Sequence, residues 1–258
     1  MDYFVAPHSI VRTIWGKSDT VLFIFAGAAA EFALNKAVDW LYFTGKLPAD
    51  PLGRLFSTVE YARRIVFAER AAAEQAIDTI AAIHGAVEAK RGAAIPDWAY
   101  RDVLYMLIDY SIRSFELLER PLTAAEREEV FDVFARVGRR MGLVEVPDSH
   151  AQWLVARHEH LAQDLSPSRF TTDLFLQYRH HLGGLRYGLL QQAQRLVLPA
   201  VVRQMLHQSS WSWLRPLVPV YRRTQHLRVA RWAINALLPA AYQAQIQALD
   251  EPPVLRPV

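Results

Sequence analysis

Apolar residues recur at spacings of three and four along most of this 258-residue sequence. Such spacing places them on one face of an α-helix. The clearest run consists of Val103, Leu104, Leu107, Ile108, Ser111, Ile112, Phe115 and Leu118. The alternating β-branched runs and the Asn-Gly or Asp-Gly turns that are typical of β-hairpins are missing. The sequence therefore predicts an all-α fold.

Several residue pairs mark where helices begin. Asp50 and Pro51 predict a start, with Asp50 as the N-cap and proline in the first turn. Thr123 and Glu126 have the spacing of a capping box. Together with the periodicity, these signals predict eight to ten helices in one domain, 1–258. The expected helices include 70–90, 97–119, 148–164, 166–184, 188–207 and 224–247.

The most apolar window is 20–43, and it contains Glu31, Lys36 and Asp39. A membrane-spanning helix needs roughly 20 residues with few charges. The window fails this requirement from its middle onward, so we expect a buried helix within the protein.

Charge is distributed unevenly along the chain. Residues 174–249 contain nine arginines and no lysine, aspartate or glutamate, whereas residues 1–173 have a net charge of −5. The basic segment also contains Trp211, Trp213 and Trp232. Its arginines are expected to pair with acids of the first 173 residues, with carboxylates of a cofactor or with an anionic membrane surface. No nucleic-acid-binding signature accompanies them, so nucleic acid is not an expected partner.

The chain has no cysteine, which excludes disulfides, iron–sulfur clusters and thiolate-bound zinc or haem. The opening residues lack the basic and apolar regions of a signal peptide. These features favour a cytoplasmic location, with possible peripheral association to a membrane.

His84 lies in an apolar stripe with Ile77, Ile80 and Val87 on the expected helix 70–90. A lone histidine in this setting is most often a structural residue. It is also suited to be the axial ligand of a haem, since haem is a flat apolar disc that needs one donor atom. The pairs His158/His160 and His180/His181 are too closely spaced in sequence to share a metal ion on one helix face.

An ordered set of short motifs resembles the oxygenase family that includes the rubber oxygenase (latex clearing protein) and the oxygenase of mycophenolic acid biosynthesis. The resemblance covers about 20–160. Its elements are Gly27, 50-DPLGRLFST-58, 66-VFAE-69, 83-IHGAV-87, 97-DWAYRDVLYMLID-109, 120-RPLTAAERE-128 and 142-GLVEVPDS-149.

This resemblance implies a globin-like helical core that holds haem b, with His84 as the iron ligand. It places Arg54 and Thr58 beside the haem, and Ser57 where the rubber-cleaving branch has a lysine that closes the sixth iron position. The rubber-cleaving branch also has an arginine one turn after the iron-binding histidine, and this sequence has Glu88 at that position. Glu31 is a candidate for the distal carboxylate. The alternative is that Glu31 is a partly exposed acid or is paired with an arginine.

The function expected from the resemblance is a haem-dependent oxygenase that acts with O₂ on an apolar substrate, such as an isoprenoid or another alkene. A non-catalytic haem- or lipid-binding helical protein is the alternative. That alternative includes a protein that sits at a membrane surface through its arginine-rich segment.

Overall fold

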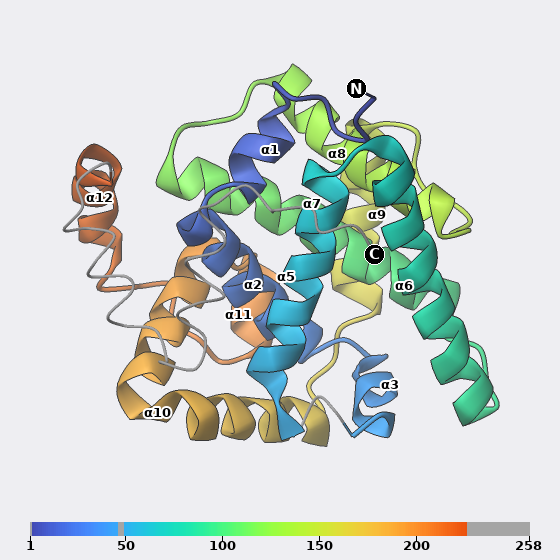
Figure 1. Cartoon of the computed structure of the whole chain (residues 1–258). Helices are drawn as coiled ribbons and strands as arrows, with labels where there is room; N and C mark the ends of the chain where they lie inside the picture. Colours follow the sequence, from blue (N-terminus) through green and yellow to red (C-terminus); the bar gives the residue numbers. More distant parts are fainter. Residues whose placement is uncertain (1, 46–48, 226–258) are drawn as a thin grey trace.

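The computed structural model describes residues 2–45 and 49–225 (Figure 1). Within these ranges it contains eleven α-helices and no β-strand, which confirms the all-α prediction. The α-helices are α1 (Ile10–Trp15), α2 (Ser18–Phe32), α3 (Val38–Phe43), α5 (Pro51–Phe67), α6 (Arg70–Arg91), α7 (Asp97–Leu118), α8 (Ala124–Arg140), α9 (His150–Gln163), α10 (Arg169–Val197), α11 (Ala200–Met205) and α12 (Val218–Thr224).

The packing of α2 on α7 forms the centre of the molecule, and this pair makes the most extensive helix contact in the structure. Gly27 makes the close approach possible, since a Cβ atom at this position would lie 2.3 Å from the ring of Tyr110. The core around this pair is rich in large side chains with almost no exposure. They include Trp15, Ile24, Ile108, Phe131 and Trp153.

Helix α6 lies at the periphery of the fold (Figure 1). Ala73 and Ile77 are the buried residues of this helix. Its main neighbour is α5, and α8 covers a smaller part of it. The second half of α6, which carries His84, is therefore partly open to solvent.

The predicted helix starts are confirmed in detail. The Asp50 side chain accepts a hydrogen bond from the Gly53 N–H, and α5 begins at Pro51. Thr123 and Glu126 form the expected capping box at the start of α8. These bonds satisfy backbone N–H groups that the first turn of a helix leaves without partners.

One predicted helix has the wrong extent, and another stops where it was expected to stop. The window 20–43 is divided into α2 and α3, because a turn at 33–37 is held by Asn35, whose side chain accepts from the Ala37 N–H. The helix expected to stop at the glycine pair Gly183-Gly184 does so, and a second helical segment of α10 follows it to Val197. Gly183 has φ +72° and ψ 168°, which is not a helical conformation and is one that glycine adopts readily.

The region after α10 was predicted in part. The helix expected over 188–207 is interrupted at Pro199, since α10 ends at Val197 and α11 begins at Ala200. Helix α12 begins at Val218, six residues before the start of the helix expected at 224–247. The helix predicted for 224–247 lies almost entirely outside the described residues. Over the described ranges, no helix is both long enough and apolar enough to cross a bilayer.

Candidate functional site

Two groups of polar side chains stand out from the rest of the fold. The first, which we call the His84 face, consists of Arg54, Ser57 and Thr58 on α5, His84 and Glu88 on α6, and Tyr100 on α7. The second, the buried charged cluster, consists of Glu31 on α2, Asp102, Asp109 and Tyr110 on α7, and Arg157 and His160 on α9, with Asn35 and Asp164 at its edge.

His84 has a ring nitrogen that lacks a partner. Its Nδ1 atom is buried and has no hydrogen-bond partner. The ring packs against Tyr100, with 5.1 Å between the ring centroids. Burial lowers the pKa of His84, and the nearby charge of Arg54 lowers it further. The imidazole is therefore neutral near pH 7, which is the form that ligates a metal ion.

Arg54, Ser57 and Thr58 lie within about one turn of each other on α5. Burial lowers the pKa of the Arg54 guanidinium. The hydroxyls of Ser57 and Thr58 both donate to the Arg54 carbonyl oxygen, at 2.8 and 3.1 Å. In this arrangement the two hydroxyl oxygens remain acceptors, and each O–H would have to rotate before it could donate to a ligand.

Glu88 lies one turn after His84 and is held by two donors. Its Oε1 accepts from the Ile95 N–H at 2.8 Å and from the Tyr100 hydroxyl at 3.1 Å. Burial raises the pKa of Tyr100, and the Glu88 charge adds to that rise. Tyr100 therefore remains protonated and keeps Glu88 turned toward the start of α7.

Glu31 is not part of the His84 face. It is fully buried, and Arg157 donates to both of its carboxylate oxygens, at 2.5 and 2.7 Å. The Tyr110 hydroxyl donates to it at 2.7 Å. Burial raises the pKa of Glu31, but Arg157 and His160 outweigh burial and lower it to about 2. This is the arginine-paired arrangement that the sequence left as the alternative.

The remaining members of the cluster extend this network. Arg157 also donates to Asp109, at 2.9 Å and 3.1 Å. The His160 ring lies between two carboxylates, with Nε2 at 2.9 Å from Glu31 and Nδ1 at 2.5 Å from Asp102. Burial lowers the pKa of His160, but the two carboxylates leave it above its ordinary value.

Apart from Glu31, the members of this cluster were not predicted from the sequence. His160 was assessed only together with His158, and the structure places His160 inside and His158 at the surface. The available signal was charge on helix faces that are otherwise apolar. Asp102 and Asp109 are separated by seven residues on α7, and Arg157 and His160 by three on α9, so each pair shares a face.

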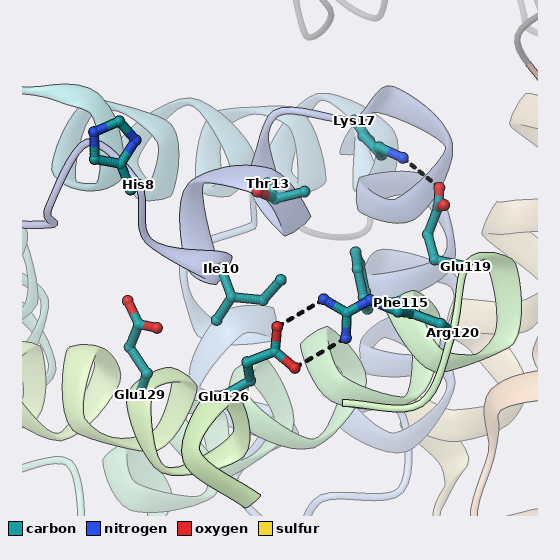
Figure 2. Close-up of a pocket in the computed structure, with 9 residues that line it drawn as sticks. All are labelled: His8, Ile10, Thr13, Lys17, Phe115, Glu119, Arg120, Glu126 and Glu129. Carbon is teal, nitrogen blue, oxygen red and sulfur yellow. Dashed lines mark hydrogen bonds and ion pairs between the residues drawn. The ribbon is translucent and has the colours of Figure 1, made fainter. Parts of the chain in front are cut away.

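A pocket of about 550 Å³ lies elsewhere, between the start of α1, the end of α7 and the start of α8 (Figure 2). Most of its charged side chains are paired with each other. Arg120 binds Glu126 with two hydrogen bonds of 2.7 and 2.9 Å, and Lys17 binds Glu119. The pocket includes none of the residues predicted for the site.

A family model described as ER-bound oxygenase mpaB/B′/Rubber oxygenase, catalytic domain, matches residues 15–247. The chain belongs to this oxygenase family. No curated protein sequence and no solved structure matches the chain. Family membership reaches beyond the expected range of about 20–160 and includes most of the arginine-rich segment.

For a member of this oxygenase family, the His84 face has the donor that a haem iron requires. Iron ligation by histidine needs a neutral ring with a free lone pair. His84 meets the first condition through its lowered pKa and the second through the unpartnered Nδ1. Arg54 supplies a cation on the neighbouring helix that suits the propionate of a haem. His84 and Arg54 therefore fit a bound haem.

Proposed function

We propose that this protein is a haem b-dependent oxygenase, with His84 as the iron ligand. The observation that carries the proposal is the buried Nδ1 of a neutral imidazole that has no protein partner. A buried ring nitrogen is expected to find a hydrogen-bond partner, since an unsatisfied buried polar group costs about 1–3 kcal/mol. A bound metal centre would remove that cost.

The haem supplies the O₂ chemistry when it is bound, and the protein supplies the ligand and the surroundings. Arg54 is positioned to bind an anionic group beside His84, either a propionate or negative charge that develops during the reaction. Thr58 contributes a hydroxyl oxygen and gains a donor function if its O–H leaves the Arg54 carbonyl. Glu31 has no role in this proposal, because all its nearby donors already hold it.

Ser57 stands where the resemblance places a lysine, and a serine hydroxyl is a poor iron ligand. We therefore propose that one iron position remains open to external ligands. The ferric protein should bind imidazole or cyanide with a clear spectral change. A low-spin spectrum that does not change when imidazole or cyanide is added would mean that another side chain binds the iron.

The substrate that best suits this face is an apolar molecule, such as an isoprenoid or another alkene. Ile83, next to His84, has 40% of its surface exposed, and much of α6 lies open around it. Exposed apolar surface beside a metal centre favours an apolar partner.

Oxygen uptake tests the catalytic part of the proposal. The haem-reconstituted protein should consume O₂ when an isoprenoid alkene is added, and His84→Ala should not. His150→Ala is a matched control, because burial also lowers the pKa of that histidine. Haem-loaded protein that consumes no O₂ with any alkene would favour the non-catalytic haem-binding alternative.

A membrane-surface role is the second candidate function. Four apolar side chains near the end of the described chain are well exposed: Trp211, Trp213, Leu217 and Val220. Arg215 and Arg223 lie among them, and indole rings together with arginines suit an anionic membrane surface. Arg203 and Arg222 bind backbone carbonyls, namely those of Leu198, Leu117 and Glu116.

Co-sedimentation with liposomes tests this role. We expect binding to anionic liposomes at low salt, a loss of binding at raised salt, and no binding to neutral liposomes. Trp211→Ser with Trp213→Ser should weaken binding. Equal recovery with anionic and neutral liposomes would remove the electrostatic part of the proposal.

A further inference from the structure

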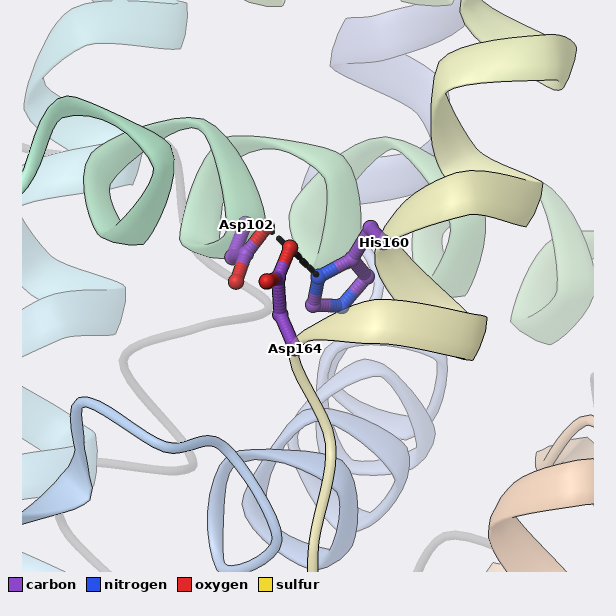
Figure 3. A group of neighbouring side chains, drawn as sticks. All are labelled: Asp102, His160 and Asp164. Atoms are coloured by element: carbon purple, nitrogen blue, oxygen red, sulfur yellow. Dashed lines mark ion pairs between the residues drawn. The ribbon is translucent and has the colours of Figure 1, made fainter.

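Three potential metal ligands meet at one end of the buried charged cluster, where α9 ends against the start of α7 (Figure 3). They are Asp102 of α7, His160 in the last turn of α9 and Asp164 directly after it. One donor atom from each lies within 4.8 Å of the other two. Asp102 and His160 are buried, and Asp164 has partial access to solvent.

His160 is oriented in the way that metal-binding histidines usually are. Its Nε2 faces the Glu31 carboxylate at 2.9 Å, and Glu31 is itself fixed by Arg157. A carboxylate behind the outer ring nitrogen fixes the tautomer and leaves the other nitrogen with a lone pair. That other nitrogen, Nδ1, points toward Asp102 and Asp164 (Figure 3).

The Nδ1 atom has close oxygen neighbours and still lacks a well-directed hydrogen bond. It lies 2.5 Å from Asp102 and 3.7 Å from Asp164, yet it has no partner with hydrogen-bond geometry. His160 is only 3% exposed, so water does not readily supply one. Donor atoms that share a cation at bond lengths of about 2.1 Å lie about 3 Å apart in octahedral and about 3.4 Å apart in tetrahedral geometry, and both values are between these two distances.

The two carboxylates are also held in place. The Asn35 amide donates to Asp102 Oδ2 at 2.8 Å, which leaves Oδ1 facing the histidine. Asp164 is fixed through its backbone, since its N–H donates to the His160 carbonyl and its carbonyl accepts from the Lys36 N–H. Asp102 and Asp164 can therefore each offer a carboxylate oxygen to a cation without a change in the backbone.

Charge also favours a cation at this end of the cluster. Four carboxylates belong to the network: Glu31, Asp102, Asp109 and Asp164. They face the guanidinium groups of Arg157 and Arg113, with the Lys36 ammonium nearby. In the metal-bound form His160 is neutral, and the four carboxylates then outnumber the three cations in a largely buried place. A divalent cation would neutralise the remaining negative charge.

We propose that Asp102, His160 and Asp164 bind a divalent first-row transition metal ion of the Zn²⁺ or Mn²⁺ type. One imidazole nitrogen and two carboxylate oxygens suit these ions. Three protein ligands leave coordination positions for water, and the partly exposed Asp164 gives the ion a path to the site. The site does not depend on the haem proposed at His84, and no residue is shared between them.

Calorimetric titration of the full-length, EDTA-treated protein with Zn²⁺ tests the site. We expect one saturable site that Asp164→Asn weakens at least tenfold. Asp164→Asn should fold normally, because the substitution keeps the backbone bonds and alters a side chain at the edge of the cluster. His158→Asn is the matched control, since it removes an exposed histidine from the same helix and should leave the affinity unchanged.

Cobalt provides a second readout. Co²⁺ in the site should give visible d–d absorption that Asp164→Asn reduces and His84→Ala leaves intact. Equal Zn²⁺ affinity and stoichiometry in wild type and Asp164→Asn would overturn the proposal, and so would loss of the site in His158→Asn or His84→Ala. Failure to bind Zn²⁺ at micromolar concentration would also overturn it and leave His160 as an imidazolium between two carboxylates. None of these results bears on haem binding.

Discussion

The buried charged cluster and the His84 face differ in how their polar groups find partners. In the cluster, Glu31 alone has four donors around it, and Arg157 bridges two acids. In the His84 face, the central imidazole has a buried nitrogen without a partner, and its helix is largely exposed. At the centre of the cluster, Glu31 and Arg157 satisfy each other, and the unpartnered Nδ1 of His160 lies only at its Asp164 end. In the His84 face, the unpartnered nitrogen is at the centre.

The paired charges at the centre of the cluster therefore have a structural role. Glu31 and Arg157 lie between the three helices α2, α7 and α9 and help to fix their relative positions. Removing one member of a buried pair leaves the other charge without compensation. His84 contributes much less to the fold, since its surroundings are half open. The following experiments test whether the two regions respond to mutation in these different ways.

The largest effect is expected for Arg157→Leu. The substitution leaves the buried carboxylates of Glu31 and Asp109 without their shared guanidinium. The free energy of unfolding should fall by about 3–5 kcal/mol, as measured by urea denaturation. His84→Ala in the same assay should cost much less, with the far-ultraviolet helical signal retained. Similar losses for both variants would contradict the comparison.

Glycine-to-alanine substitutions in the two regions should have opposite signs. At Gly27, a Cβ would overlap the Tyr110 ring next to Glu31, so Gly27→Ala should destabilise by about 1–3 kcal/mol. At Gly85, beside His84, a Cβ meets no atom within 4 Å. Gly85→Ala should therefore stabilise the helix by about 0.5–1 kcal/mol. Thermal unfolding of both variants measures the difference, and equal shifts would show that α2 and α7 are not tightly apposed.

The smallest effect is expected at Glu126, a half-buried carboxylate near the surface that is paired with Arg120. Hydrogen bonds from Arg120 and the Thr123 backbone lower the pKa of Glu126 to about 2. A lowered folded-state pKa stabilises the protein above the unfolded value of about 4.5, and this contribution is lost as the pH falls toward 2. Because the pair is at the surface, Glu126→Gln should cost less than about 1 kcal/mol at pH 7.

The pH dependence of the free energy of unfolding tests whether ionised Glu126 stabilises the protein. Urea unfolding of wild type and Glu126→Gln should differ at pH 7 and converge as the pH approaches 2. A difference that stays constant over this range would mean that the ion pair with Arg120 contributes nothing. Glu126→Asp serves as a control, since it keeps the charge and shortens the side chain.

The sequence predicted the helices well where local chemistry decides their limits. Asp50, the capping box at Thr123 and the Pro96-Asp97 start all depend on neighbouring residues, and all are present in the structure. The break at Asn35 was missed, because the turn is stabilised by contacts with 164–166, far away in the chain. The stop at Gly183 was predicted, because it depends on the backbone freedom of the glycine itself.

The candidate site was predictable only through the ordered motifs. They indicated Arg54 and His84, which the structure places on adjacent helices close enough for the Arg54 charge to affect the His84 pKa. The buried cluster was not predictable from spacing, since its members come from three helices and pair only in the folded chain. The globin-like character of the core and the roles of Ser57 and Thr58 remain predictions.

Haem content is the most direct test of the account. The purified protein, supplied with haem b, should show a Soret band, and His84→Ala should lose it while keeping its helical signal and its Zn²⁺ affinity. His150→Ala should retain the band. A His84→Ala protein that binds haem as fully as the wild type would contradict the account.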